Sequence, residues 1–321
     1  MTGEKLLTVE ASPHIHAKAT TSRVMLDVIL ALIPTLAAAA VIFGPRVLLI
    51  CAVTVGSCVL FEYLSRRVMK RPNTVGDLSA VVTGLILACN LPASTPLWMA
   101  AFGSLAAIVV VKQMFGGIGQ NFINPAIAGR IVMTVSFPAA MSAWTAPRIL
   151  QTADAVTGAS PLTELKNQSE ALPSLLHMLL GARMGSLGEV CAAALLLGGA
   201  YLLVRRVISP AIPLSFIGTV AVVMLIANRG DFTLLAYQLL GGGLLLGAIF
   251  MATDYSTSPL HTKGKIIYGI GCGAITCVIR LFGAMPEGVS FAIILMNILV
   301  PHIEKLTLPK PFGRAKKEVR Q

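Results

Sequence analysis

Hydrophobic and polar residues divide the chain into long apolar blocks joined by short polar connections. Ten blocks approach the ~20 residues that a helix needs to cross a bilayer. They run over residues 22–43, 46–64, 77–91, 96–114, 122–141, 189–207, 211–228, 233–252, 265–283 and 287–303. The pattern predicts an all-α integral membrane protein with about ten transmembrane helices, several of them short or interrupted by proline and glycine.

Composition agrees with this prediction. Hydrophobic residues make up 55% of the 321 residues and charged residues 12%, with a mean hydropathy of +0.81. Such a chain is too apolar for an ordinary water-soluble domain. Residues 1–21 contain charged and histidine side chains without an apolar core, so we expect no cleavable signal peptide before the first block.

The formal net charge of +11 raises the question of nucleic-acid binding. The basic residues are instead distributed as membrane topology requires. With a cytoplasmic N-terminus, eighteen of the 25 lysines and arginines fall on the cytoplasmic side, which is the asymmetry that orients membrane proteins. We therefore expect no nucleic-acid partner, both termini in the cytoplasm, and an external loop after the fifth block.

Two stretches of the chain share a weak sequence pattern. Ala88-Cys-Asn90 precedes Pro96-Leu97 at the end of the third block, and Ala252-Thr-Asp254 precedes Pro259-Leu260 at the end of the eighth. Because five blocks separate them, the second copy enters the membrane from the opposite side, which predicts inverted repeats with a binding site between interrupted helices. The alternative is that these stretches are ordinary loops. The expected segments are an N-terminal cytoplasmic segment (1–21), a first five-helix repeat (22–141), an external loop (142–188), a second five-helix repeat (189–303) and a basic cytoplasmic tail (304–321).

The external loop contains Asp154-Ala-Val-Thr157-Gly158-Ala159-Ser160. Gly158 and Ala159 form a small, turn-forming platform, which we expect to leave the Ser160 hydroxyl exposed and uncrowded. The run resembles the D-x-x-(S/T)-G-A-(S/T) signature of covalently flavinylated proteins, in which the last hydroxyl carries the phosphate of FMN. An ordinary loop turn can have the same sequence.

Polar residues also enter the membrane blocks. Asn121 and Asn124 stand three apart before Pro125, so they can lie on one face and offer two amides to a planar heterocycle, although asparagine also caps helices. Arg130 should face protein or a ligand phosphate, with snorkelling to the membrane edge as the alternative. Asp254 is the acid best placed to bind a cation or a flavin N–H.

The remaining charged residues, cysteines and histidines predict neither a hydrolytic site nor a metal site. Glu62 and Asp77 are expected to balance the neighbouring basic cluster of Arg66, Arg67, Lys70 and Arg71. The six cysteines lie in apolar blocks without C-x-x-C spacing, so we interpret them as packing residues and expect neither a metal site nor an iron–sulfur cluster held by this chain. No catalytic triad or histidine cluster appears, and we assign no catalytic residue.

Together these residues resemble the RnfD/NqrB family, which comprises a membrane component of the ion-translocating ferredoxin:NAD⁺ oxidoreductase (Rnf) complex and its relative in the sodium-pumping NADH:quinone oxidoreductase. The resemblance is carried by Ser12-Pro-His-Ile-His16, Gly119 to Pro125, Thr157 to Ser160, and Ala252-Thr-Asp254 with Ser258-Pro259. It implies ten helices, FMN esterified to Ser160 and a noncovalent riboflavin contacted by Asn121 and Asn124. The family usually has Thr where this chain has Ser160 and often Ser where it has Thr157, so Thr157 is a competing acceptor.

The resemblance implies an electron-carrying subunit that passes electrons between the covalent FMN and an intramembrane flavin, coupled to Na⁺ or H⁺ translocation. The resemblance further implies a location in a prokaryotic cytoplasmic (inner) membrane. The implied partners are Rnf subunits A, B, C, E and G, a flavin transferase and membrane lipid. Ferredoxin and NAD are expected only through partner subunits, since no dinucleotide fingerprint occurs here. The Rnf form is favoured because about 21 residues precede the first block. The alternatives are a subunit of the quinone-reducing enzyme or a small-solute channel or transporter without a cofactor.

Overall fold

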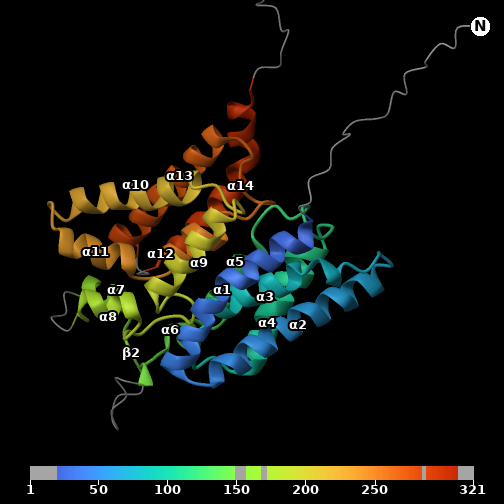
Figure 1. Ribbon diagram of the computed structural model, residues 1–321, viewed down its shortest axis with the longest axis horizontal. Coiled ribbons are helices and arrows are strands. Elements are labelled where there is room, and N and C mark those ends of the chain that lie inside the picture. The colour runs from blue at the N-terminus through green and yellow to red at the C-terminus, as the bar shows by residue number, and fades with distance from the viewer. Residues whose placement is uncertain (1–19, 149–156, 168–171, 284–286, 310–321) are drawn as a thin grey trace, which may run out of the picture.

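Helices form at every apolar block of the chain. The computed structural model describes residues 20–148, 157–167, 172–283 and 287–309, and Figure 1 shows them as helices joined by short connections. The first half contains α1 (Thr21–Phe43), α2 (Arg46–Val68), the single turn η1 (Val75–Asp77), α3 (Ser79–Cys89), α4 (Leu97–Leu105), its π-helical continuation η2 (Ala106–Gln113), and α5 (Pro125–Ser136).

The second half also contains long and interrupted helices, but here the long ones come last. It contains α9 (Ala192–Val204), α10 (Ala211–Ala227), α11 (Phe232–Leu240), α12 (Leu244–Leu246) continuing as the π-helical η4 (Gly247–Met251), α13 (Thr262–Phe282) and α14 (Val289–Thr307). Proline and glycine account for several of the boundaries. Pro125 takes the first position of α5, where its missing N–H costs little.

Helix length separates these elements into two groups. Among the described residues, α1, α2, α13 and α14 are long and apolar enough to cross a bilayer, and α11 with residues 244–251 makes a fifth crossing if this pair, bent by 60°, is one span. Five further apolar helical stretches have 10–17 residues: 79–89, 97–113, 125–136, 192–204 and 211–227. A multi-pass membrane protein follows from this, while the count of ten spans stays a prediction.

The two halves pack together along α1 and α9. In Figure 1 the first-half helices, blue to teal, and the second-half helices, orange to red, lie on opposite sides, with α1 and α9 against each other between them. The contact is close because Gly198 of α9 has no side chain: a Cβ there would lie 2.2 Å from the Ala31 carbonyl oxygen of α1. Small residues permit such approaches between membrane helices. One continuous core, including Leu32, Leu195 and Phe250, fills the seam.

The interrupted helices are bonded to other parts of the chain where they end. After α3, the Gly188 N–H donates to the Cys89 carbonyl (2.7 Å) and the Leu187 N–H to the Leu91 carbonyl (3.0 Å). At the end of η4, the Met251 carbonyl accepts from Asn124 Nδ2 at 3.1 Å. Backbone groups inside a membrane protein need such partners because lipid offers none.

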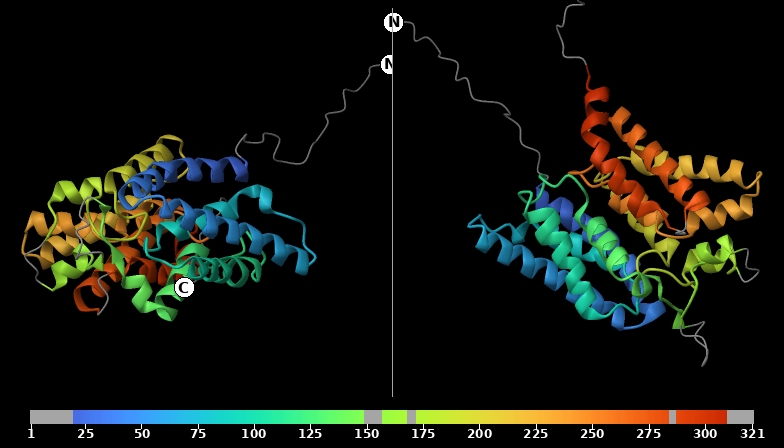
Figure 2. Two further views of the ribbon diagram at one scale, coloured as in Figure 1. Left: turned by 90° about the horizontal axis from the view of Figure 1, so that it is seen from below. Right: turned by 180° about the vertical axis from the view of Figure 1, so that it is seen from behind.

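The connection between the halves contains short elements. These are α6 (Pro138–Ser142), a two-stranded antiparallel sheet of β1 (Trp144–Thr145) and β2 (Thr157–Gly158), α7 (Pro161–Lys166) and α8 (Leu175–Leu180). Trp144 pairs with Gly158 in this sheet. Figure 2 shows α7 and α8, in yellow-green, beside α11 at one end of the molecule.

The α1–α9 contact gives a test of the seam. We expect Gly198→Ala to destabilise the protein by about 1–3 kcal/mol, because the added methyl group would overlap a backbone carbonyl that cannot rotate away. Gly218→Ala in α10 is the matched control, since nothing lies within 4 Å of a Cβ at that position. Thermal unfolding of both variants in detergent measures the difference. Equal melting temperatures would contradict the close contact.

Candidate functional site

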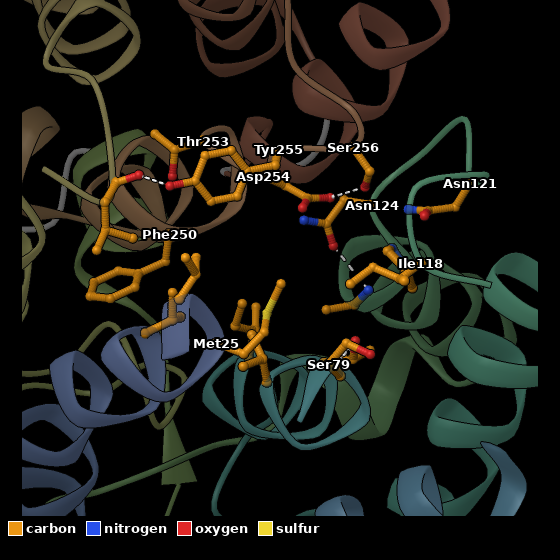
Figure 3. A pocket seen from close by; sticks show the side chains of 18 of the residues that line it. Met25, Ser79, Ile118, Asn121, Asn124, Phe250, Thr253, Asp254, Tyr255 and Ser256 are labelled. Carbon is orange, nitrogen blue, oxygen red and sulfur yellow. Dashed lines mark hydrogen bonds between the residues drawn. The ribbon is translucent and has the colours of Figure 1, made fainter. Parts of the chain in front are cut away.

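A cavity lies among α1, α3, η2, α9, η4 and the segment that leads into α5. We call it the asparagine cavity; its empty space, including the part open to the outside, is about 730 Å³. Figure 3 shows Asp254, Ser256, Asn124 and Asn121 along one side of it, and Met25 and Phe250 on another. Both π-helical segments reach the cavity, η2 with Lys112 and η4 with Phe250; π-helical turns are frequent at functional sites.

The two predicted asparagines line this cavity in different ways. Asn124 caps α5: its Oδ1 accepts from the N–H groups of Ala126 (3.0 Å) and Ile127 (3.3 Å). Asn121 precedes the helix and donates from Nδ2 to the Ile123 carbonyl at 3.0 Å. The expectation that they share a helical face was therefore wrong, because the helix begins only at Pro125. Both residues nevertheless line the same cavity.

Asp254 stands at the end of the eighth block, on the polar side of the same cavity. Its Oδ2 accepts from Ser256 Oγ (3.1 Å) and Thr257 Oγ1 (3.0 Å). Figure 3 shows its carboxyl group close to the side chain of Asn124. The structure thus brings together residues that are 130 positions apart in the sequence.

Lys112, another residue of the cavity wall, belongs to a buried ion pair. Lys112 Nζ lies 2.7 Å from Glu62 Oε2 and donates to Ser79 Oγ at 2.6 Å, and Thr74 Oγ1 donates to Glu62 Oε1 at 2.7 Å. Asp77 accepts from the Ser79 N–H at the start of α3 (2.8 Å). The expectation that Glu62 and Asp77 balance the nearby basic cluster was wrong. The partner of Glu62 comes from η2, 50 residues away, and its only sequence signal was a lysine inside an apolar block.

A second cavity lies beside the predicted attachment motif, and we call it the serine cleft. It measures about 1450 Å³ including its open part. Its walls comprise residues of α5 and α6, Trp144, the motif residues and the start of α14: Arg130, Ile131, Thr134, Pro138, Ala139, Met141, Ser142, Trp144, Gly158, Ala159, Ser160, Thr163, Glu287, Ser290 and Phe291.

Ser160 lines this cleft but is only 3% exposed. The expectation of an exposed, uncrowded hydroxyl was therefore wrong. Ser160 caps α7, with Oγ 3.4 Å from the Thr163 N–H and 3.0 Å from Thr163 Oγ1, and this local role draws its side chain inward. Gly158 is also crowded, since a Cβ there would lie 2.6 Å from Met184 Sδ. Asp154 and the side chain of Thr157 lie outside the described residues.

Arg130 lies in the wall of the serine cleft and faces protein, as predicted. Its Nη1 donates to Asn90 Oδ1 at 2.7 Å, and its Nη2 forms an ion pair with Glu287 Oε2. With 7% of its surface exposed, it does not snorkel to the membrane edge. Asn90 in turn donates from Nδ2 to Met251 Sδ at 3.3 Å.

Helix α5 therefore connects the two cavities. Asn124 at its N-terminus lines the asparagine cavity, and Arg130 lines the serine cleft; six residues at 1.5 Å per residue separate them by about 9 Å along the helix. The two cavities are therefore separated by less than two turns of one helix, and each has a few polar groups in a mostly apolar wall.

Comparison with known proteins adds a family to this geometry. Residues 8–313 match the model of the NQR2, RnfD, RnfE family. The chain belongs to this family. One relative is the D subunit of the Na⁺-translocating ferredoxin:NAD⁺ oxidoreductase complex of Acetobacterium woodii, 45% identical over 98% of each chain. Another is the D subunit of the proton-translocating ferredoxin:NAD⁺ oxidoreductase complex of Clostridium ljungdahlii, 40% identical over 97% of each chain.

A third relative in the NQR2, RnfD, RnfE family is the D subunit of the ion-translocating oxidoreductase complex of Stutzerimonas stutzeri. It is 38% identical, over 92% of this chain and 93% of its own. The resemblance to the family seen in the sequence is confirmed. The names of the first two relatives differ in the ion, Na⁺ in one and the proton in the other.

The cap of α5 gives a stability test for this site. We expect Asn124→Ala to destabilise the protein by about 1–2 kcal/mol, because it removes the helix cap and the bond to the Met251 carbonyl. Asn121→Ala removes a single local hydrogen bond and should cost clearly less. Thermal unfolding without added flavin compares them. An equal loss in both variants would contradict the distinct roles.

Proposed function

We propose that this protein is the membrane flavoprotein subunit of an ion-translocating ferredoxin:NAD⁺ oxidoreductase complex, with FMN esterified to Ser160 in the serine cleft and a noncovalent flavin, riboflavin, in the asparagine cavity. The observation that carries the proposal is the placement of the attachment motif and the two asparagines in neighbouring cavities joined by α5. The names of the relatives support membership in such a complex.

The serine cleft has features that fit a large polar ring system. Glu287 Oε1 and Ser290 Oγ are buried in its wall without a hydrogen-bond partner among the described residues, and buried oxygens of this kind usually have one. Trp144 and Phe291 offer aromatic faces for stacking. The pairing of Trp144 with Gly158 holds the indole beside the motif.

The residues that line the asparagine cavity support the proposal of an uncharged flavin ring there. Its polar side offers the amides of Asn121 and Asn124 and the carboxylate of Asp254, which together supply hydrogen-bond donors and acceptors. The rest of the wall is apolar, with Met25, Val82, Ile86 and Phe250 among its residues. A few convergent polar groups in an apolar cavity are typical of cofactor sites.

The roles of the side chains follow from these positions. Flavins, when bound, accept and release electrons singly or in pairs. Ser160 would anchor the covalent flavin through its Oγ, and Arg130 would hold one wall of that cleft through Asn90 and Glu287. Asn124 keeps α5 in place between the cavities, and Asn121 and Asp254 orient the noncovalent ring. Coupling to ion movement requires two conformations that differ in ion affinity; the ion is Na⁺ or H⁺.

The proposal includes a topology. Ten membrane segments form two inverted five-helix repeats, with both termini in the cytoplasm and the connection carrying Ser160 on the external face. The contacts of α1 with α9 and of α5 with α14, which pair equivalent members of the two halves, support it. Rnf subunits A, B, C, E and G and a flavin transferase are the proposed partners, and soluble partners bind ferredoxin and NAD.

The covalent bond can be tested in denaturing gels. In a host that contains the flavin transferase, we expect the wild-type band to fluoresce under ultraviolet light and Ser160→Ala to lose the signal, because an ester survives denaturation. Thr163→Ala is the matched control, since it removes the hydroxyl that contacts Ser160 Oγ without removing the acceptor. Retention in Ser160→Ala with loss in Thr157→Ala would assign Thr157 as the acceptor instead. A dark wild-type band would favour a transporter without a cofactor.

The noncovalent flavin can be tested by extraction. We expect Asn121→Ala to lower the affinity for the noncovalent flavin at least tenfold relative to wild type, so that less of it remains bound after purification. The reason is that about 1–3 kcal/mol is lost when a buried polar group of a binding site loses its partner. Flavin released by acid from the purified complex, measured per chain, is the readout, and the ester-bound flavin serves as the internal control. Unchanged release would contradict a contact at Asn121.

A further inference from the structure

The wall of each cavity contains one buried basic side chain, and each of these side chains is paired with a carboxylate. Lys112 lines the asparagine cavity and is paired with Glu62, which is not one of the lining residues, whereas both Arg130 and its partner Glu287 line the serine cleft. The exposed fractions of these side chains are 3% and 0% for the first pair and 8% and 15% for the second. By contrast, the ion pair of Arg205 with Asp27 leaves 57% of the arginine exposed and lines neither cavity among the described residues.

Lys112 can direct part of its charge into the asparagine cavity. An ammonium group has three N–H donors, of which Glu62 and Ser79 accept two. Asp254, from the segment after η4, faces the same cavity, so its carboxylate opposes the charge of Lys112 there. A ring between them would have a cation near one edge and a carboxylate near another.

Arg130 places a permanent charge in the wall of the serine cleft. A guanidinium does not lose its proton in proteins, so burial cannot neutralise it. Asn90 and Glu287 hold its two terminal nitrogens. Glu287 uses only one of its oxygens in this way, and the other is buried without a partner among the described residues.

We propose that Lys112 and Arg130 each raise the reduction potential of the flavin in their own cavity, and that Glu62 and Glu287 moderate that effect. The inference rests on the proposed function. One electron, supplied by a reduced one-electron carrier of the partner subunits, adds one negative charge to a flavin. A nearby cation in surroundings of low dielectric constant lowers the free energy of that charged state, and a carboxylate raises it.

The pairing predicts that the cation variant and the carboxylate variant shift the flavin reduction potential in opposite directions, which a purely structural role would not produce. Lys112→Met removes the cation and should lower the potential of the noncovalent flavin, whereas Glu62→Gln frees the ammonium from its partner and should raise it. The same opposition holds for Arg130→Met and Glu287→Gln at the covalent flavin. Loss of packing alone would shift both members of a pair in the same direction.

The experiment is a spectroelectrochemical titration of the natively produced complex in detergent, with dithionite as reductant. For each cation variant we expect at least a tenfold fall in the equilibrium constant for one-electron reduction of the flavin in the same cavity, which equals about 59 mV. The carboxylate variants should give a rise, and the other flavin should stay unchanged. A Ser160→Ala background, which retains only the noncovalent flavin, assigns the two signals, and Arg205→Met is the matched control.

The double variants Lys112→Met/Glu62→Gln and Arg130→Met/Glu287→Gln guard against misfolding, because removal of one partner leaves a buried charge, whereas removal of both does not. They should shift the potential less than the cation variants. The inference would be overturned if the variants kept both flavins at their wild-type reduction potentials, or if the cation variant and the carboxylate variant of one pair shifted the potential in the same direction. Either result would leave the proposed function unaffected. Wild-type complex without flavin would instead overturn the proposed function.

Discussion

The hydrogen bonds between α5 and the two interrupted helices hold the polar interior of this protein together. Asn124 binds the carbonyl of Met251 at the end of η4, and Arg130 binds Asn90 at the end of α3. Lipid cannot satisfy a free carbonyl or an isolated guanidinium, so these groups are stable inside the membrane only because other segments of the chain supply their partners. The helix interruptions, the contact between the two halves and both cavities depend on these hydrogen bonds between segments.

This constraint also explains why two cavities occur side by side. An interrupted helix leaves space where its next turn would have been, and polar side chains from neighbouring elements line that space. Because α5 is bonded to both breaks, its N-terminus and its second turn face different cavities. Membership of the chain in the NQR2, RnfD, RnfE family and this geometry together support electron transfer across one helix.

The sequence predicted what depends on local pattern. Helices formed at each apolar block, since hydrophobic pattern and helix starts are short-range signals. The meeting of Asn121, Asn124 and Asp254 in one cavity depends on contacts between distant segments and was not predicted. Long-range pairing was missed: Glu62 joins Lys112 across 50 residues, and Arg130 joins Glu287 across 157. The exposure of Ser160 was predicted wrongly because capping of a short helix outweighed the small size of its neighbours.

The central claim is that each chain holds two flavins, one joined to Ser160 and one free in the asparagine cavity. The most direct measurement is a flavin count on the natively produced complex: acid precipitation, quantification of the released flavin, and mass spectrometry of the peptide that contains Ser160. The account predicts one released riboflavin per chain and a Ser160 peptide heavier by FMN less one water. An unmodified peptide together with no released flavin would contradict it.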